Sequence, residues 1–120
     1  KENTILLVKH TYHDSWYLPG GRMKKGETFE QAIRRELHEE LDCELYSIRL
    51  FGVYNSFNEY KNDSIVIFYS DDFSFTGKTD GEIERYDFFK LNKLPEEVSM
   101  GTRKRIEEYT KGCTSNFGIW

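Results

Sequence analysis

One segment, residues 20–43 (GGRMKKGETFEQAIRRELHEELDC), constrains this chain more than any other. A glycine-rich turn leads into a pattern typical of an amphipathic helix. Residues three and four apart share one helix face, so Glu36, Glu39 and Glu40 fall within roughly 100° of arc. Carboxylates that close repel one another unless a cation neutralises them. The spacing therefore favours a hard, oxygen-seeking ion such as Mg²⁺ or Mn²⁺.

The alternative for such a helix is a solvated acidic face. The helical wheel counts against this alternative, because Ile33, Leu37 and Leu41 form an apolar stripe and the acids border it. Phe29 flanks the stripe, and the polar back of the helix consists of Gln31, Arg34 and His38. An unpaired charge beside the buried side of a helix is costly. A metal-binding or catalytic role is thus the competing interpretation.

The segment resembles the signature sequence of the Nudix hydrolases. The matching residues, at the family's spacing, are Gly21, Glu27, Arg35, Glu36, Leu37, Glu39 and Glu40, and residues 16–21 (WYLPGG) are similar to the usual lead-in. Two positions depart from the pattern, which usually has Gly in place of Asp42 and an aliphatic residue in place of Cys43. The Gly would be a helix C-cap with positive φ, and Asp tolerates that conformation better than most residues.

The resemblance implies a fold and an activity for the chain. The fold is an α/β/α sandwich with a mixed β-sheet, in a single domain over residues 1–120. The family usually has a strand before the point where this chain begins, so an N-terminal strand upstream of residue 1 is expected to be missing. The implied reaction is hydrolysis of a nucleoside diphosphate linked to another group, by attack of water at a P–O bond.

The resemblance also implies roles for individual residues. Three glutamates match the family's metal-binding acids: Glu36, Glu39 and Glu40. Glu27 matches the acid that orients the helix or a metal-bound water, and a carbonyl of Gly20 or Gly21 is a further metal ligand. Arg35 lies about 40° from Glu39 on the wheel and resembles the family's structural arginine, which fixes carboxylate rotamers through charge-assisted hydrogen bonds. The expected catalytic set is Arg35, Glu36, Glu39 and Glu82.

Glu82 enters that set as a general base from outside the helix. Many family members supply a further glutamate from a loop before a late strand, and Gly81-Glu82-Ile83 has that setting. Side chains alternate along a strand, so Glu82 and Glu84 point to the same side and the pattern alone does not choose between them. Glu82 is preferred because it lies nearer the loop, and Glu36 is the base if neither acts. Otherwise both are exposed edge residues.

Substrate identity depends on residues outside the signature. Aromatic residues near loops could stack on a base: Trp16, Tyr54, Phe57 and Tyr60. Of these, Trp16 and Tyr60 are the expected substrate-binding residues; Tyr60 has the spacing that the family associates with dinucleoside polyphosphate hydrolysis. Residues 57–60 read FNEY, without the Pro associated with ADP-ribose hydrolysis. Core packing is the alternative for each of these rings.

Composition limits the partners. The net charge is −4 with no basic block, which argues against duplex nucleic acid because backbone affinity depends on positive charge. No apolar run approaches a membrane span, and no secretory signal is visible. Cys43 and Cys113 fit no metal motif; two free thiols in a reducing cytosol are expected, with a single disulfide as the alternative. We expect a cytoplasmic monomer or homodimer with a small nucleotide substrate.

Two other function classes are compatible with this fold. A non-catalytic, Nudix-like nucleotide-binding module would carry a degenerate signature, whereas every signature acid is intact here. An isomerase of a prenyl diphosphate would need a cysteine in the cleft, and Cys43 at the helix end is poorly placed for that role.

The rest of the chain divides into strands, loops and a second helix. The expected strands are residues 4–8, 16–18, 44–55, 64–70 and 82–90, and the expected helices run from the N-cap Thr28 to Leu41 and over residues 102–111. Residues 9–15, 56–62, 71–81 and 91–99 are expected to be loops. The apolar tail, residues 113–120, should dock on the domain.

Overall fold

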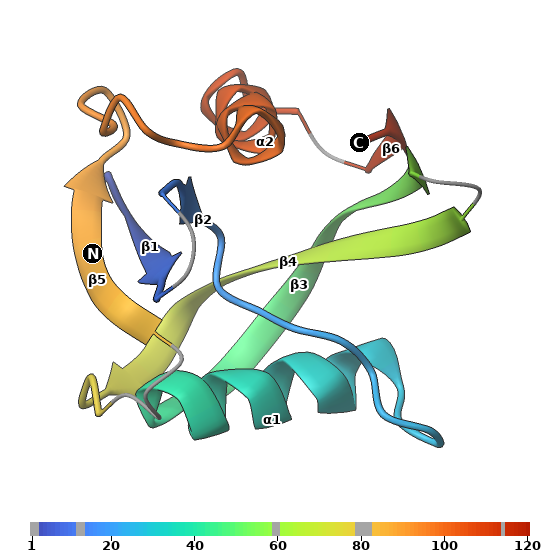
Figure 1. The fold of residues 1–120 in the computed structure, drawn as a ribbon, viewed down its shortest axis with the longest axis horizontal. Helices are drawn as coiled ribbons and strands as arrows, with labels where there is room; N and C mark the ends of the chain where they lie inside the picture. The colour runs from blue at the N-terminus through green and yellow to red at the C-terminus, as the bar shows by residue number, and fades with distance from the viewer. Residues whose placement is uncertain (1–2, 12–13, 59–60, 79–82, 114) are drawn as a thin grey trace.

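A computed structural model describes residues 3–11, 14–58, 61–78, 83–113 and 115–120. It contains two helices and six strands in one compact unit (Figure 1). In chain order they are β1 (Thr4–His10), β2 (Trp16–Tyr17), α1 (Phe29–Leu41), β3 (Cys43–Asn58), β4 (Lys61–Phe75), β5 (Ile83–Lys90), α2 (Met100–Thr110) and β6 (Asn116–Ile119). No helix in these ranges is long and apolar enough to cross a membrane.

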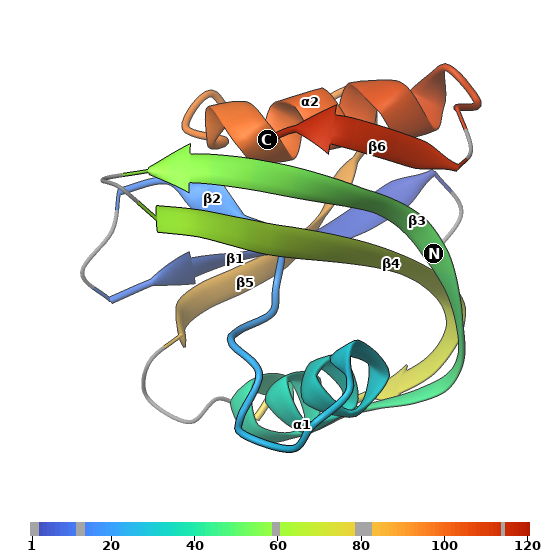
Figure 2. The same ribbon diagram turned by 90° about the vertical axis from the view of Figure 1, so that its right-hand side faces the viewer.

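The strands form two three-stranded sheets between the helices. One sheet has the order β2-β1-β5 and is antiparallel; the other has the order β4-β3-β6, in which β3 pairs antiparallel with β4 and parallel with β6. Figures 1 and 2 show α1 at one end of this pair of sheets and α2 at the other. The predicted α/β sandwich with a mixed sheet is confirmed.

Helix α1 begins and ends where the sequence predicts. Thr28 is its N-cap: the Thr28 hydroxyl accepts from the Gln31 N–H, and the Gln31 side chain accepts from the Thr28 N–H, which makes a capping box. Asp42 is its C-cap, with φ 50° and ψ 50°. Asp42 therefore adopts the left-handed conformation expected at the family's glycine position, and its Oδ2 accepts a hydrogen bond from Thr76 Oγ1 at 2.8 Å.

Strands β3 and β4 are longer than the sequence predicted. The expected loop over residues 56–62 is mostly ladder, with Ser56 paired to Asp63 and Asn58 to Lys61, and the expected loop after Ser70 begins only after Phe75. The prediction was wrong after Ser70 because the polar residues Asp71 and Asp72 occupy exposed positions of a strand whose backbone is paired. Strand β1 likewise extends to His10, into the expected loop.

The core consists of two clusters of buried apolar residues. One joins α1 to β1, β3 and β5 through Val8, Leu37, Leu41, Cys43, Leu45 and Ile83; the other joins β1 to α2 through Leu7, Trp16, Val98 and Ile106. Phe29, expected beside the buried stripe, is 41% exposed because it lies at the first turn of α1. Cys43 is a buried free thiol and Cys113 an exposed one.

The C-terminal tail docks on the domain, as predicted. Strand β6 pairs with β3 from Gly52 to Asn55, and the Trp120 N–H donates to the Asn55 carbonyl at 2.8 Å. The Trp120 ring lies so close to Gly101 of α2 that a Cβ there would come within 2.3 Å of its Nε1. The tail therefore links the mixed sheet to α2.

Candidate active site

The glycine turn before α1 comes into close contact with the first acid of the helix. A Cβ built on Gly21 would lie 1.9 Å from Glu36 Oε2, so only glycine fits at this position while the carboxylate keeps its place. Gly20 precedes it with φ +154°, in the range that favours glycine. The Gly-Gly pair thus lets the backbone approach the acidic face of α1.

A tight turn places Glu27 beside the same face. The Glu27 N–H donates to the Lys24 carbonyl at 3.0 Å, and the Lys24 N–H donates back to Glu27 Oε1 at 2.7 Å. Gly26 supplies the positive φ, +87°, that this turn needs. The turn fixes both the backbone and the carboxylate of Glu27.

Arg35 connects the turn to the helix. Its Nε and Nη2 donate to the two Glu27 carboxylate oxygens at 2.6 and 3.0 Å, and its Nη1 donates to Glu36 Oε1 at 2.7 Å and Glu39 Oε1 at 3.1 Å. Nη2 also donates to the Arg22 carbonyl at 2.9 Å. One guanidinium therefore holds three of the predicted site carboxylates in fixed positions.

These contacts change the acid–base properties of the pair. The hydrogen bonds from Arg35, followed by the one from the Lys24 backbone, lower the pKa of Glu27 to about 2. Conversely, Glu27 and Glu36 raise the pKa of Arg35 above its already high ordinary value. Glu27 is therefore ionised, and Arg35 charged, throughout the physiological range.

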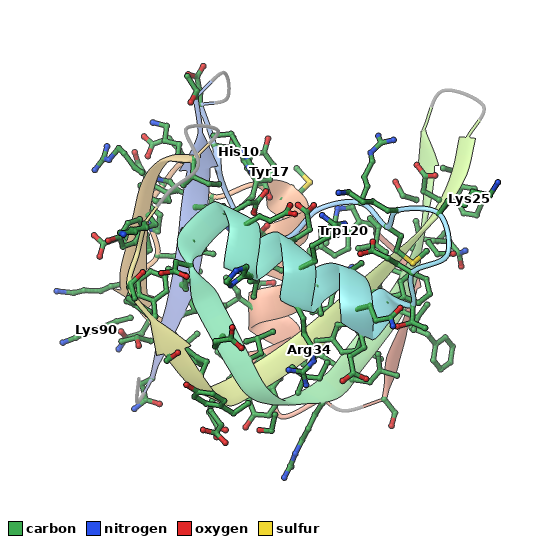
Figure 3. All side chains as sticks on the ribbon, turned by 90° about the horizontal axis from the view of Figure 1, so that it is seen from below. His10, Tyr17, Lys25, Arg34, Lys90 and Trp120 are labelled. Atoms are coloured by element: carbon green, nitrogen blue, oxygen red, sulfur yellow. The ribbon has the colours of Figure 1, made fainter. Side chains whose placement is uncertain are left out.

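The three glutamates Glu36, Glu39 and Glu40 of α1 differ in exposure. Glu40 is buried at 4% exposure, the Glu36 side chain is 16% exposed, and the Glu39 side chain is 49% exposed. The acids thus run from the core to the surface. Arg34 extends from the other side of α1 towards β3, where it donates to the Leu45 carbonyl and pairs with Glu30 (Figure 3).

The donor chemistry of this face fits a hard divalent cation, since it offers carboxylate oxygens and a close backbone turn. Within the described ranges, however, no three acidic, histidine or cysteine side chains are grouped as a metal site. Arg35 Nη1 binds one oxygen of the Glu36 carboxylate and one oxygen of the Glu39 carboxylate. The residue types and their positions along α1 suit a divalent cation. The roles of these residues as metal ligands remain predictions.

The remaining predicted site residues are one core residue and residues outside the described ranges. Trp16 belongs to the core: it is 4% exposed, its ring packs edge-to-face on Phe89 at 4.9 Å, and the Arg85 guanidinium lies 5.4 Å from its centre. Burial leaves little of this ring for a base to stack on. Tyr60 and Glu82 lie outside the described residues, as does the side chain of Glu84, so their roles stay predictions.

Two backbone groups of the site could not be read from residue types. The Arg22 carbonyl and the Lys24 N–H bind Arg35 and Glu27 through main-chain atoms that every residue carries.

A cavity of about 640 Å³ lies behind this site, between the two sheets. Ile33 and Leu37 of α1 line it at one end, together with Leu18 and Pro19 from the segment before the glycine turn. Arg105 and Ile106 of α2 line it at another. The inner face of α1 and the residues leading to the Gly-Gly pair therefore border a space that can hold a small molecule.

Comparison with known proteins is consistent with this arrangement. Residues 1–109 match the model of the NUDIX domain. The chain is 31% identical over 92% of its length to an ADP-ribose pyrophosphatase of Methanocaldococcus jannaschii, of which it covers 68%. It is 30% identical over 87% of its length to the NAD-capped RNA hydrolase NudC of Vibrio atlanticus, of which it covers only 39%.

A solved structure supports the same assignment. The MutT NUDIX hydrolase of Burkholderia pseudomallei superimposes with a TM-score of 0.80 and 26% identity, over 89% of this chain and 88% of that one. The family match covers most of the chain, including the acids gathered around Arg35. The chain therefore belongs to the Nudix hydrolase family.

Proposed function

We propose that this protein is a metal-dependent pyrophosphohydrolase that cleaves a nucleoside diphosphate linked to another group. The observation that carries the proposal is the Arg35 network, in which one guanidinium holds Glu27, Glu36 and Glu39 beside the glycine turn. Gathering several acids around one face of a helix is the organisation that a cation-binding site needs.

The acids of α1 would hold Mg²⁺ or Mn²⁺, with Glu36, Glu39 and Glu40 as side-chain ligands. Glu27 and a carbonyl of Gly20 or Gly21 complete the proposed donor set. The ion, when bound, neutralises the pyrophosphate and makes water a better nucleophile. Arg35 orients the carboxylates and holds Glu27 ionised, and Gly21 keeps the backbone within reach of Glu36.

A general base accepts the proton of the attacking water while a P–O bond of the pyrophosphate breaks. We assign this role to Glu82, because acids committed to a cation make weak bases. A positioned base contributes typically 10²–10⁴-fold to the rate, so Glu82→Gln should lose about that much kcat. If Glu84→Gln is the impaired variant, the role belongs to Glu84; if neither loses activity, Glu36 is the base.

For the substrate we propose a small nucleotide, such as a nucleotide sugar or a dinucleoside polyphosphate. The relative from Methanocaldococcus jannaschii is named an ADP-ribose pyrophosphatase, whereas residues 57–60 of this chain lack the proline associated with that activity. Tyr60 is the proposed stacking residue; its replacement by Ala should raise KM roughly tenfold on dinucleoside polyphosphates.

A nucleotide panel tests the proposed function. Purified protein is incubated with nucleoside triphosphates, nucleotide sugars, dinucleoside polyphosphates and a prenyl diphosphate, with and without Mg²⁺ or Mn²⁺, and products are resolved by chromatography. We expect metal-dependent release of nucleoside monophosphate from at least one nucleotide. Binding without turnover, or isomerisation of the prenyl diphosphate, would contradict the proposal.

A further inference from the structure

Strand β6 is an edge strand that carries no charge. Among the described residues it has one neighbour, β3, in the sheet order β4-β3-β6. Sheet edges are usually protected from pairing with other chains by charged residues or prolines. Residues 113–120 (CTSNFGIW) contain neither, although 32% of the chain is charged. The edge of β6 is therefore suited to pairing with a further strand.

The side of this sheet that faces away from α2 is apolar where β6 joins β3. Val53 pairs with Phe117 in the β3–β6 register, and Asn55 pairs with Ile119. Paired residues lie on one face of a sheet, as do alternate residues of one strand, so Phe57 of β3 lies on this face too. Figure 2 shows no helix in front of it. We call this the outer face; its apolar side chains are Val53, Phe57, Phe117 and Ile119.

These four side chains are far more exposed than apolar residues of a sheet normally are. Phe117 is 86% exposed, Ile119 72%, Phe57 64% and Val53 39%. The face of an antiparallel sheet that meets solvent is normally polar, whereas here residues 50–57 (LFGVYNSF) also carry no charge. A contiguous exposed apolar surface of this kind marks an interaction site.

The size of the outer face fits a dimer interface. A whole aromatic side chain presents about 200 Å², so the exposed fractions of the four side chains give roughly 500 Å² of apolar surface per copy. Homodimer interfaces are about 65% apolar, so an interface that covers this surface would bury roughly 800 Å² per partner. Stable interfaces of standard size bury about 800 Å² on each partner.

The backbone of β6 also has the geometry for pairing with itself. The Trp120 N–H donates to the Asn55 carbonyl at 2.8 Å, so Trp120 directs its backbone towards β3. Alternate residues direct their backbone groups to opposite edges of a strand. Phe117 and Ile119 therefore present N–H and C=O groups at the free edge. An antiparallel pair of β6 strands with Gly118 on the two-fold axis places Phe117 opposite Ile119 of the second copy, so that these groups match.

We propose that the protein forms a two-fold symmetric homodimer in which β6 pairs antiparallel with β6 of a second copy. The two sheets then become one six-stranded sheet. Phe117 and Ile119 form an aromatic–β-branched cross-strand pair twice, which is a stabilising combination. A two-fold contact of this kind is closed, so assembly stops at the dimer.

The charge distribution favours a second copy as the occupant of this edge. Two copies with a net charge of −4 each repel one another. The charge-free segments 50–57 and 113–120 form the part of the surface where that repulsion is weakest. An unrelated strand would also fit the edge, but it would not account for the two-fold match between Phe117 and Ile119.

Analytical ultracentrifugation over a concentration series tests the dimer. We expect the wild-type mass to approach twice the 14.3 kDa of one chain. Phe117→Glu places a charge opposite Ile119 of the second copy and should weaken self-association by at least about tenfold, because an unpaired charge in an interface is costly. Tyr46→Glu is the matched control: Tyr46 is a 60% exposed aromatic residue of β3 outside the stretch Gly52–Asn55 that pairs with β6, so this variant should dimerise like the wild type.

Two double variants test the register. Phe117→Glu/Ile119→Lys puts opposite charges into each cross-strand pair, whereas Phe117→Glu/Ile119→Glu puts like charges there, which is unfavourable. Both lose the same apolar side chains, so a purely hydrophobic contact would weaken equally in both. The Glu/Lys variant should dimerise at least about tenfold more tightly than the Glu/Glu variant, with a difference that shrinks as salt is added.

Three results would overturn the inference. They are a wild type that stays monomeric at every concentration, a Phe117→Glu variant that dimerises like the wild type, and equal self-association of the two double variants. None of these results bears on the nucleotide panel, because Figures 1 and 2 show α1 at the opposite end of the sheets from β6. The dimer and the proposed function can therefore fail independently.

Discussion

The Arg35 guanidinium donates two hydrogen bonds to the Glu27 carboxylate, from Nε at 2.6 Å and from Nη2 at 3.0 Å. This paired contact joins a turn before α1 to the middle of the helix. Because Nη1 of the same group holds Glu36 and Glu39, the position of one carboxylate depends on the others. The candidate site thus behaves as a unit, and the predictions below use that dependence.

Replacing Arg35 by Lys should reduce activity far more than it reduces stability. Lysine keeps the charge but cannot form the planar paired contact with Glu27 while also reaching Glu36. Loss of a residue that orients metal ligands costs roughly 10–100-fold in metal affinity or activity. Steady-state kinetics and calorimetry with Mg²⁺ measure the effect. Arg34→Lys is the matched control, since Arg34 binds Glu30 and β3 on another side of the helix; an equal loss in both variants would contradict the special position of Arg35.

Gly21→Ala should displace Glu36. The new Cβ would lie 1.9 Å from Glu36 Oε2, so the carboxylate must leave its place beside Arg35. We expect activity to fall at least tenfold, because mutations that disturb the positions of metal ligands typically cost roughly 10–100-fold in activity. Gly112→Ala provides the contrast: that Cβ meets nothing within 4 Å, but φ is +78°, so about 1–3 kcal/mol of stability is lost through strain while activity persists. Normal activity of Gly21→Ala would show that Glu36 is not needed in its present position.

Asp42 offers a test of the helix C-cap. Its φ of 50° favours glycine, yet its Oδ2 accepts from Thr76 at 2.8 Å. Asp42→Gly relieves the backbone cost but loses a hydrogen bond worth about 1 kcal/mol, so stability should change little. Asp42→Ala loses the bond and keeps the strain, and should be less stable than Asp42→Gly by about 1 kcal/mol. Urea unfolding measures both variants, and a more stable Ala variant would contradict the left-handed cap.

The raised pKa of Tyr54 predicts that the protein loses stability at alkaline pH. Burial, followed by the hydrogen bond to Glu108, raises the pKa of Tyr54 to about 12. A group whose pKa is higher in the folded state contributes stability that is complete below its unfolded pKa, about 10, and is lost as pH rises through 12. Two pKa units correspond to about 3 kcal/mol. Between pH 9 and 12 the wild type should therefore lose about that much more stability than Tyr54→Phe in urea titrations; parallel curves would contradict the assigned pKa.

The sequence predicted the acidic helix well because local rules govern it. The capping residue Thr28 follows from residue preference at helix N-termini, and the buried stripe of Leu37 and Leu41 follows from helical periodicity. The left-handed cap at Asp42 follows from the conformation that Asp tolerates. Each of these features is determined by residues that are close together in the sequence.

The features that the sequence did not predict depend on contacts between distant segments. Strands β3 and β4 continue through polar residues because each backbone pairs with the other, which residue types alone do not reveal. Trp16 belongs to the core because β5 covers it, through Phe89. Arg105 is buried because Tyr54 and Trp120, from β3 and the tail, enclose it. No local pattern around Arg105 distinguishes it from an exposed helical arginine.

Metal affinity of the α1 acids tests the central claim most directly. Isothermal calorimetry with Mg²⁺ and Mn²⁺ is carried out on the wild type, on Glu36→Gln, Glu39→Gln and Glu40→Gln, and on Glu30→Gln as an exposed control from the first turn of α1. Each of the first three variants keeps its shape and loses one charge, so we expect metal binding weakened at least tenfold and turnover lost with it, whereas Glu30→Gln should match the wild type. Unchanged affinity in all three variants would contradict the account.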